Sequence, residues 1–254
     1  MKKFILSFLV VFALISCVPK REYTQEKLQS HKEIARIYLA EGRYQDALRE
    51  LTLGISTDKC DAEIYNLLGI VYLNLKDYAK AEEFLNEALK LDPNFSEAYN
   101  NLGLLHLLQG RYQQAISYFE KALANPLYAN AHAAKTNMAQ AYYLLGDKNK
   151  ALEILTALLK ERPDHAQALI ELGKIYLNER DLQGAEFYLK QALKLDRASS
   201  EARYYLGEVF FQQGKFDLAK ELWESLIQIR PDSPWSSLAR EKVFFLERLR
   251  TQKP

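Results

Sequence analysis

Apolar residues recur along most of this chain at helical spacing, and the whole pattern repeats about every 34 residues. An alanine marks each period, with successive spacings of 34, 34, 36, 34 and 34 residues, and a large apolar residue follows four positions later. Apolar positions at this spacing predict amphipathic helices. The alanines are Ala47, Ala81, Ala115, Ala151, Ala185 and Ala219, and the large residues are Leu51, Leu85, Phe119, Leu155, Leu189 and Trp223.

Small residues and prolines predict where each period turns. Thirteen positions before each alanine stands a large apolar residue followed directly by glycine or alanine, as in Leu68-Gly69. In four periods a late glycine lies seven positions after this small residue, where a first helix must stop and reverse. In three periods a proline marks the end of a second helix. The late glycines are Gly42, Gly110, Gly146 and Gly214, and the prolines are Pro93, Pro163 and Pro231.

Each period is therefore predicted to be a helix-turn-helix hairpin, and the chain an all-α array of about six hairpins. One hairpin cannot bury its apolar stripe alone, so neighbouring hairpins stack into a solenoid with a continuous core. The six repeats are expected at 28–61, 62–95, 96–131, 132–165, 166–199 and 200–233. Repeat three carries Asn125-Pro126-Leu127-Tyr128 and two extra residues, so the turn after it should be longer.

Residues 234–254 predict one more helix and a short tail. Ser233 and Pro234 stand in the order of an N-cap and a first helical residue. Trp235, Leu238 and Leu246 lie on one apolar side of the helix that follows. We interpret it as a capping helix that covers the exposed end of the solenoid, with a partner-binding helix as the alternative.

The spacing Tyr65-x2-Leu68-Gly69-x2-Tyr72, then Ala81-x3-Leu85 and Pro93, resembles the tetratricopeptide (TPR) repeat. The resemblance covers about residues 28–233 and implies a TPR superhelical solenoid whose first helices line a concave groove. Repeats one and five depart from the pattern, because Lys59 and Arg197 stand where proline is expected.

The first segment resembles the signal of a bacterial lipoprotein. Lys2 and Lys3 precede an apolar run of about 12 residues, which is too short to span a bilayer. A buried core segment is the alternative for this run. Leu14-Ile15-Ser16-Cys17 resembles a lipobox, which implies that residues 1–16 are a signal peptide and that Cys17 is lipidated and anchors a tether over 17–27 to the membrane. Many lipoproteins that stay at the inner membrane have an aspartate after the cysteine, so the resemblance, with Val18 in that place, implies the periplasmic face of the outer membrane.

Composition excludes several classes of partner and chemistry. The net charge of +1 argues against a nucleic-acid partner, and two cysteines cannot form a disulfide framework or a multi-thiolate metal site. Four scattered histidines and the lack of a P-loop, dinucleotide fingerprint or hydrolase motif predict no catalytic residue, no metal, no cofactor and no small-molecule substrate. Cys60 is interpreted as an inert thiol, with a cross-link to a partner as the alternative.

The TPR resemblance places a peptide-binding groove on the second, fifth, ninth, twelfth and thirteenth residues of each first helix. In the middle repeats these positions and their neighbours form an apolar trough edged by amides that can pair with a peptide backbone. The alternative is that they pack against adjoining helices. The groove residues are Asn66, Ile70, Leu73, Asn100, Asn101, Leu104, Leu107, Leu108, Asn137, Tyr143 and Leu144.

A lipid-anchored array of six such repeats, with its insertion at 125–128, resembles the type IV pilus biogenesis and stability lipoproteins. These include the pilotins, which escort the secretin to the outer membrane and promote its assembly. The resemblance implies a non-catalytic assembly factor that binds a protein partner, the secretin or another pilus component, in its groove. The alternative is a scaffold that tethers a periplasmic protease or peptidoglycan enzyme by raising its effective concentration; an enzyme is the third possibility.

Overall fold

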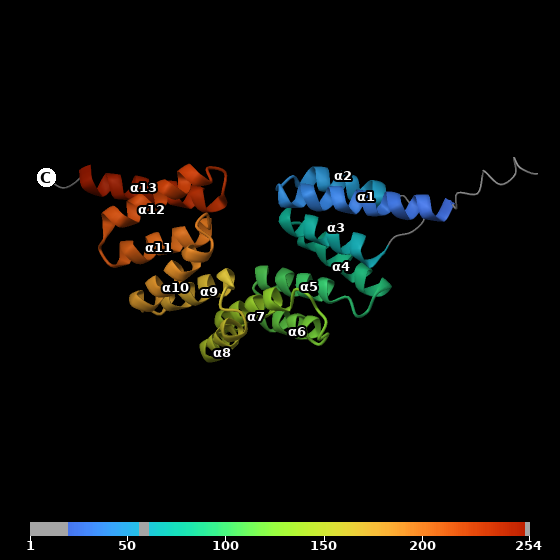
Figure 1. Cartoon of the computed structure of the whole chain (residues 1–254), viewed down its shortest axis with the longest axis horizontal. Coiled ribbons are helices and arrows are strands. Elements are labelled where there is room, and N and C mark those ends of the chain that lie inside the picture. Colours follow the sequence, from blue (N-terminus) through green and yellow to red (C-terminus); the bar gives the residue numbers. More distant parts are fainter. Residues whose placement is uncertain (1–19, 56–60, 252–254) are drawn as a thin grey trace, which may run out of the picture. The chain divides into compact units, whose positions relative to one another are not determined.

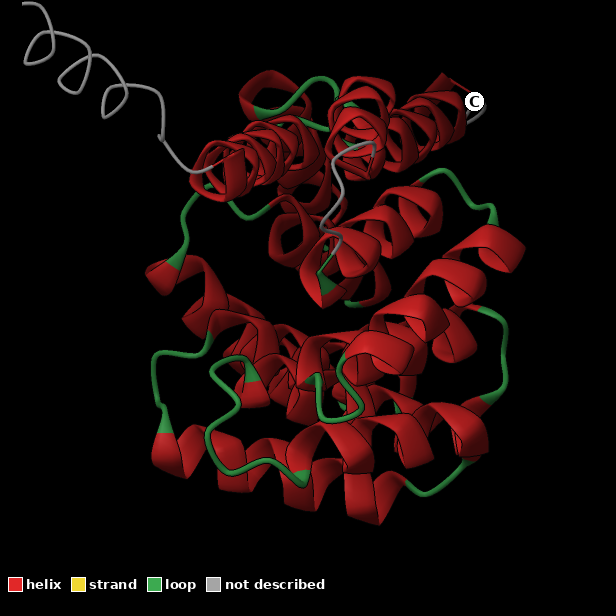
Figure 2. Ribbon diagram, turned by 90° about the vertical axis from the view of Figure 1, so that its right-hand side faces the viewer, coloured by secondary structure: helices red, strands yellow, loops and turns green. Residues whose placement is uncertain are grey.

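The computed structural model describes residues 20–55 and 61–251, and in these ranges the regular structure consists of thirteen helices without a strand (Figures 1 and 2). The all-α prediction is confirmed. The helices are α1 (Lys20–Ala40), α2 (Tyr44–Ile55), α3 (Ala62–Asn74), α4 (Tyr78–Leu91), α5 (Ser96–Leu108), α6 (Tyr112–Leu123), α7 (Ala131–Leu145), α8 (Lys148–Glu161), α9 (Ala166–Asn178), α10 (Leu182–Leu195), α11 (Ser200–Gln212), α12 (Phe216–Ile229) and α13 (Pro234–Thr251).

The helices pair as six hairpins, and α13 packs on the last of them. Each odd-numbered helix from α1 to α11 contacts the even-numbered helix that follows it, and α13 contacts both α11 and α12. Side-chain caps start many of the helices: Asp61 accepts from Ile64 N at the start of α3, and Asp147 accepts from Lys150 N at the start of α8. These bonds satisfy backbone donors that the first turn of a helix leaves without a partner.

The repeating alanines and large apolar residues form the core between paired helices. All six alanines, from Ala47 to Ala219, have no exposed surface, and the large residue four positions later is equally buried in every repeat. The small site on the first helix makes room for that large residue. A Cβ at Gly207 would lie 2.3 Å from the Trp223 ring, so only glycine allows α11 and α12 to approach this closely.

The chain divides into two compact halves at the longer turn after repeat three. The N-terminal half runs to Ala129 and contains α1 to α6, while the C-terminal half begins at Asn130 and contains α7 to α13. Seven residues, 124–130, separate α6 from α7, whereas four residues separate α4 from α5, α8 from α9, and α10 from α11. The inserted residues therefore lengthen this turn as the sequence predicts.

Candidate functional site

The first helices of successive repeats lie side by side within each half. α3 contacts α1 and α5 in the N-terminal half, and α9 and α11 connect α7 to α13 in the C-terminal half. We call the surface that these helices carry at the second, fifth, ninth, twelfth and thirteenth residues of each repeat the first-helix face. The predicted groove residues lie on it or next to it, in α3, α5 and α7.

In the N-terminal half, part of the predicted groove is accessible. Ile70, Asn100 and Leu104 are half-buried, and Leu108 at the end of α5 keeps 54% of its surface exposed. Asn101 Nδ2 donates to Asn66 Oδ1 at 2.8 Å, which ties α5 to α3 through two side-chain amides. The accessible part is therefore an apolar strip on α3 and α5 with a bonded amide pair beside it.

Three of the predicted groove residues in this half offer a ligand almost no side-chain surface. Asn66, Leu73 and Leu107 are 5%, 7% and 7% exposed. Leu73 packs in a core cluster with Ala98, Leu102 and Leu105 of the next first helix, because the twelfth residue of α3 faces α5. For Leu73 the structure thus corrects the groove assignment in favour of the alternative, that the side chain packs against an adjoining helix.

In the C-terminal half, one of the three predicted groove residues of α7, Tyr143, takes part in a hydrogen-bond network. Leu144 is 45% exposed, and Asn137 and Tyr143 are half-buried. The Tyr143 hydroxyl donates to Glu179 Oε1 at 3.3 Å, and Lys148 Nζ donates to Glu179 Oε2 at 2.7 Å. The bond from Lys148 lowers the pKa of Glu179, while burial raises the pKa of Tyr143, so a carboxylate, an ammonium and a neutral phenol persist together at neutral pH.

The sequence analysis missed a set of ion pairs that cross the first-helix face. Lys32 Nζ is nearly buried and donates at 2.6 Å to both Asp61 Oδ2 and Glu63 Oε2, and Glu63 also binds Arg36. Burial opposes the charge of Lys32, but its hydrogen bonds to the two carboxylates outweigh that cost and raise its pKa. A free carboxylate of a ligand would therefore have to displace acids that the chain itself supplies.

A matching cluster lies in the C-terminal half. Lys174 Nζ donates to Glu171 Oε1 at 2.8 Å and to Glu201 Oε1 at 3.1 Å, and lies 5.5 Å from the centre of the Tyr205 ring. Burial raises the pKa of Glu171, and the neighbouring carboxylates raise the pKa of Lys174 although burial opposes its charge. The cluster thus places one ammonium between two carboxylates on α9 and α11.

Repeat numbering contains the signal that would have found these pairs. Arg36 and Lys174 are the ninth residues of repeats one and five, and Glu63 and Glu201 are the second residues of the repeats that follow. Both ion pairs therefore join residues 27 positions apart. A basic ninth residue followed by an acidic second residue in the next repeat predicts a bridge between neighbouring first helices.

Comparison with family models identifies the repeat. A tetratricopeptide repeat model matches residues 62–127, and a second model of the same repeat matches 106–175 and 176–241, more than half of the chain. The chain belongs to the tetratricopeptide repeat family. The TPR prediction is confirmed.

Solved structures of other TPR proteins share the fold over more than four fifths of the chain. The crystal structure of PilW, described as a widely conserved type IV pilus biogenesis factor, matches with a TM-score of 0.68 and 22% identity over 83% of this chain and 97% of PilW. PilF of Pseudomonas aeruginosa matches with a TM-score of 0.64 and 18% identity over 86% of this chain and 99% of that chain. The crystal structure of a TPR protein of Parabacteroides merdae matches with a TM-score of 0.74 and 18% identity over 87% of this chain and 84% of that chain. At these identities the likeness shows the fold.

Two curated relatives are much longer proteins. BBSome complex member BBS4 of Bos taurus is 27% identical over 82% of this chain but only 33% of its own length. Protein O-mannosyl-transferase TMTC3 of Homo sapiens is 33% identical over 34% of this chain and 10% of its own length. The TPR chain spans a third or less of these relatives, so the match covers shared repeats and not their whole proteins.

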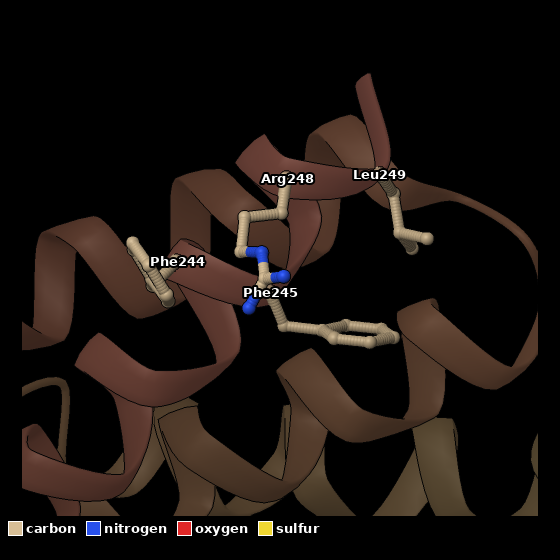
Figure 3. Close-up of a pocket in the computed structure, with 4 residues that line it drawn as sticks. All are labelled: Phe244, Phe245, Arg248 and Leu249. Carbon is tan, nitrogen blue, oxygen red and sulfur yellow. The ribbon is translucent and has the colours of Figure 1, made fainter. Parts of the chain in front are cut away.

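The TPR array ends in an aromatic region that the sequence analysis did not place in the site. Phe211, the twelfth residue of repeat six, meets Phe245 of α13 with ring centroids 6.2 Å apart. A cavity of about 250 Å³ opens on α13 and is lined by Phe244, Phe245, Arg248 and Leu249 (Figure 3). Extending the repeat numbering by one repeat places Leu238 and Phe245 at the fifth and twelfth positions, so counting through the last helix would have found them.

The described part of the TPR chain offers binding surfaces and little that favours chemistry. In the described ranges, no group of His, Cys, Asp and Glu side chains could hold a metal ion. His106 is buried and stacks on Tyr118 with ring centroids 5.0 Å apart, and burial lowers its pKa, as expected for a structural histidine. None of the described helices combines the length and apolar character needed to cross a bilayer. Cys17 and its lipobox, and Cys60, lie outside the described residues.

Proposed function

We propose that this TPR protein is a non-catalytic assembly factor of type IV pili, anchored to the periplasmic face of the outer membrane by lipid on Cys17. In this proposal its first-helix face binds a segment of the secretin and promotes the localisation and assembly of that subunit. The family supports a role in protein binding, since solenoids of this kind present extended surfaces to partners.

The observation that carries the pilus assignment is the extent of the fold match. PilW and PilF are covered over 97% and 99% of their lengths, so the shared fold takes in nearly the whole of each of those chains. The lipobox resemblance at Leu14-Ile15-Ser16-Cys17 adds the expected membrane anchor. Together the two features favour a pilus assembly factor over a scaffold for a protease or peptidoglycan enzyme.

The accessible strip on α3 and α5 is suited to an apolar peptide segment. Leu108 is exposed, and Ile70 and Leu104 keep part of their surface in reach of a ligand. Because Lys32 and Arg36 are already bound to carboxylates of the chain, the face favours apolar side chains over a free C-terminal carboxylate. Burial of these apolar side chains would supply the affinity.

The proposal is tested by titrating purified protein with the purified secretin subunit and comparing Leu108→Asp with wild type. Leu108 is exposed, so the variant should fold, and placing a carboxylate in an apolar contact should weaken binding by at least about tenfold. Leu195→Asp is the matched control, because Leu195 is 48% exposed on the second helix α10. Circular dichroism verifies that both variants are folded.

Equal affinity of wild type and Leu108→Asp would overturn the groove assignment. Absence of secretin binding by wild type would overturn the pilus proposal. In that case, recovery of a protease or peptidoglycan enzyme by cross-linking in intact cells would favour the scaffold. The membrane anchor is tested separately by acyl labelling, which should be lost in Cys17→Ser.

A further inference from the structure

The turn between α6 and α7 holds one leucine in an exposed position. α6 ends at Leu123, two residues short of the 14-residue length of α4, α8, α10 and α12, because Pro126 disfavours helical conformation in the residue before it. Within the turn, Asn125 Oδ1 accepts from Leu127 N at 3.0 Å, and Tyr128 N donates to Asn125 O at 3.1 Å. Tyr128 is buried, and burial raises its pKa to about 12. Leu127 lies between Asn125, which accepts these hydrogen bonds, and the buried Tyr128, and it is 88% exposed.

The other turns of the array show that folding does not need a leucine here. The residue after the proline is Asn94, Asp164 or Asp232 in the three other turns that have a proline in this place, and all three are exposed. Polar residues are the usual choice for such turns. At 88% exposure Leu127 exceeds every other exposed large hydrophobic residue in the described part of the chain, and contact with another molecule would bury it.

A hollow next to this turn offers positive charge and hydrogen-bond donors. Its volume is about 370 Å³, and Asn94, Tyr99, Lys121, Ala124 and Asn125 line it. Lys121 Nζ lies 5.1 Å and 5.8 Å from the ring centres of Tyr118 and Tyr99, so two aromatic faces hold the ammonium in place. None of the lining residues carries a carboxylate. The hollow is thus complementary to an acidic side chain of a partner.

The size of the contact decides what kind of partner it fits. Burying one leucine is worth roughly a 10- to 100-fold change in an equilibrium constant. Bringing two free molecules together costs on the order of a thousandfold or more. Leu127 and its hollow are therefore too small to hold a second copy of the chain by themselves, but they suffice as a second contact to a partner that is already bound elsewhere.

We propose that Leu127 and the hollow around Lys121 form a second docking point, separate from the first-helix face, for the protein segment that this face binds. The inference rests on the proposed function. The partner is expected to present an apolar socket for Leu127 next to an acidic side chain for Lys121.

The test measures the affinity of the purified secretin subunit for Leu127→Asn, Lys121→Gln and wild type. Leu127→Asn copies the residue of the turn before α5, so the turn should keep its conformation, and affinity should fall by about 10-fold or more. Lys121→Gln should weaken binding and reduce its dependence on salt, because an ion pair is lost. Leu195→Asp again serves as the control, and circular dichroism verifies folding.

The outcomes separate this inference from the function on which it rests. Wild-type affinity of Leu127→Asn, combined with weak binding by Leu108→Asp, overturns the second docking point and leaves the groove in place. Loss of affinity in Leu195→Asp as large as in Leu127→Asn also overturns it, because the effect would not be local. Absence of binding by wild type overturns both proposals.

Discussion

At the scale of single residues, the turn inside each hairpin needs a left-handed backbone. Gly42, Gly110, Gly146 and Gly214 have φ between 72° and 98°, and Lys76 and Arg180 occupy the same place with φ of 61° and 64°. Only glycine adopts this conformation without steric cost. Two of the six hairpin turns are therefore strained by their side chains.

We predict that Lys76→Gly and Arg180→Gly each stabilise the folded chain by about 0.5–1 kcal/mol. Relief of the left-handed strain outweighs the larger entropy that glycine adds to the unfolded chain. Urea unfolding monitored by circular dichroism measures the change. Gly214→Lys is the reverse control and should lose stability, and a loss of stability in both glycine variants would contradict the account.

The sequence predicted the buried residues well and the paired polar residues poorly. Ala47 and Leu51 are fully buried. Their burial could be predicted because helical spacing alone assigns them to the inner side of a hairpin. Lys32 and Glu171 are also buried, but their burial depends on carboxylates and ammonium groups that neighbouring first helices bring within hydrogen-bond distance. The hydropathy pattern does not predict these ion pairs. They can be predicted only by comparing equivalent positions in neighbouring repeats.

At the scale of elements, α9 begins at a histidine that acts as its N-cap. His165 Nδ1 accepts from Ala168 N at 3.2 Å, and this nitrogen accepts only while it carries no proton. Burial, followed by the nearby charge of His132, lowers the pKa of His165. Protonation of His165 would break the cap and would add a positive charge 6.1 Å from the centre of the His132 ring.

This cap predicts a pH dependence of stability. Because the folded pKa lies below the ordinary value of about 6.5, the unfolded chain binds more protons as the pH falls. The contribution of His165 is fully present above pH 6.5 and is lost as the pH falls through the lowered folded pKa. His165→Asn keeps a side-chain cap without a titrating group and should lose less stability than wild type between pH 7.5 and pH 5.5 in urea unfolding. An equal loss in both proteins would contradict this role.

The turn after α6 shows how far element prediction from the sequence reaches. The extra residues and Pro126 predict a longer connection, and the structure has one. The sequence could not show that Tyr128 would turn inward and Leu127 outward, since both are apolar and adjacent. That choice depends on the hydrogen bonds that Asn125 accepts from Leu127 and Tyr128.

At the scale of the whole molecule, the 34-residue period predicted the architecture because each hairpin repeats the same contacts with its neighbour. The site was predicted less completely. Ile70, Leu104 and Leu108 are accessible, whereas Leu73 belongs to the core, because the twelfth residue of a first helix faces the next repeat. The position of a residue within its repeat predicts the side of the helix on which it lies. It does not predict how much of that residue the neighbouring helix covers.

The central claim is that the first-helix face holds the secretin in the cell. We would test it by placing a photoreactive phenylalanine at position 108 or 195 in the full chain, irradiating intact cells and blotting for the secretin. Leu108 and Leu195 are similarly exposed but lie on a first and a second helix. The account predicts a secretin adduct from position 108 and none from position 195; no adduct from position 108, or equal adducts from both, would contradict it.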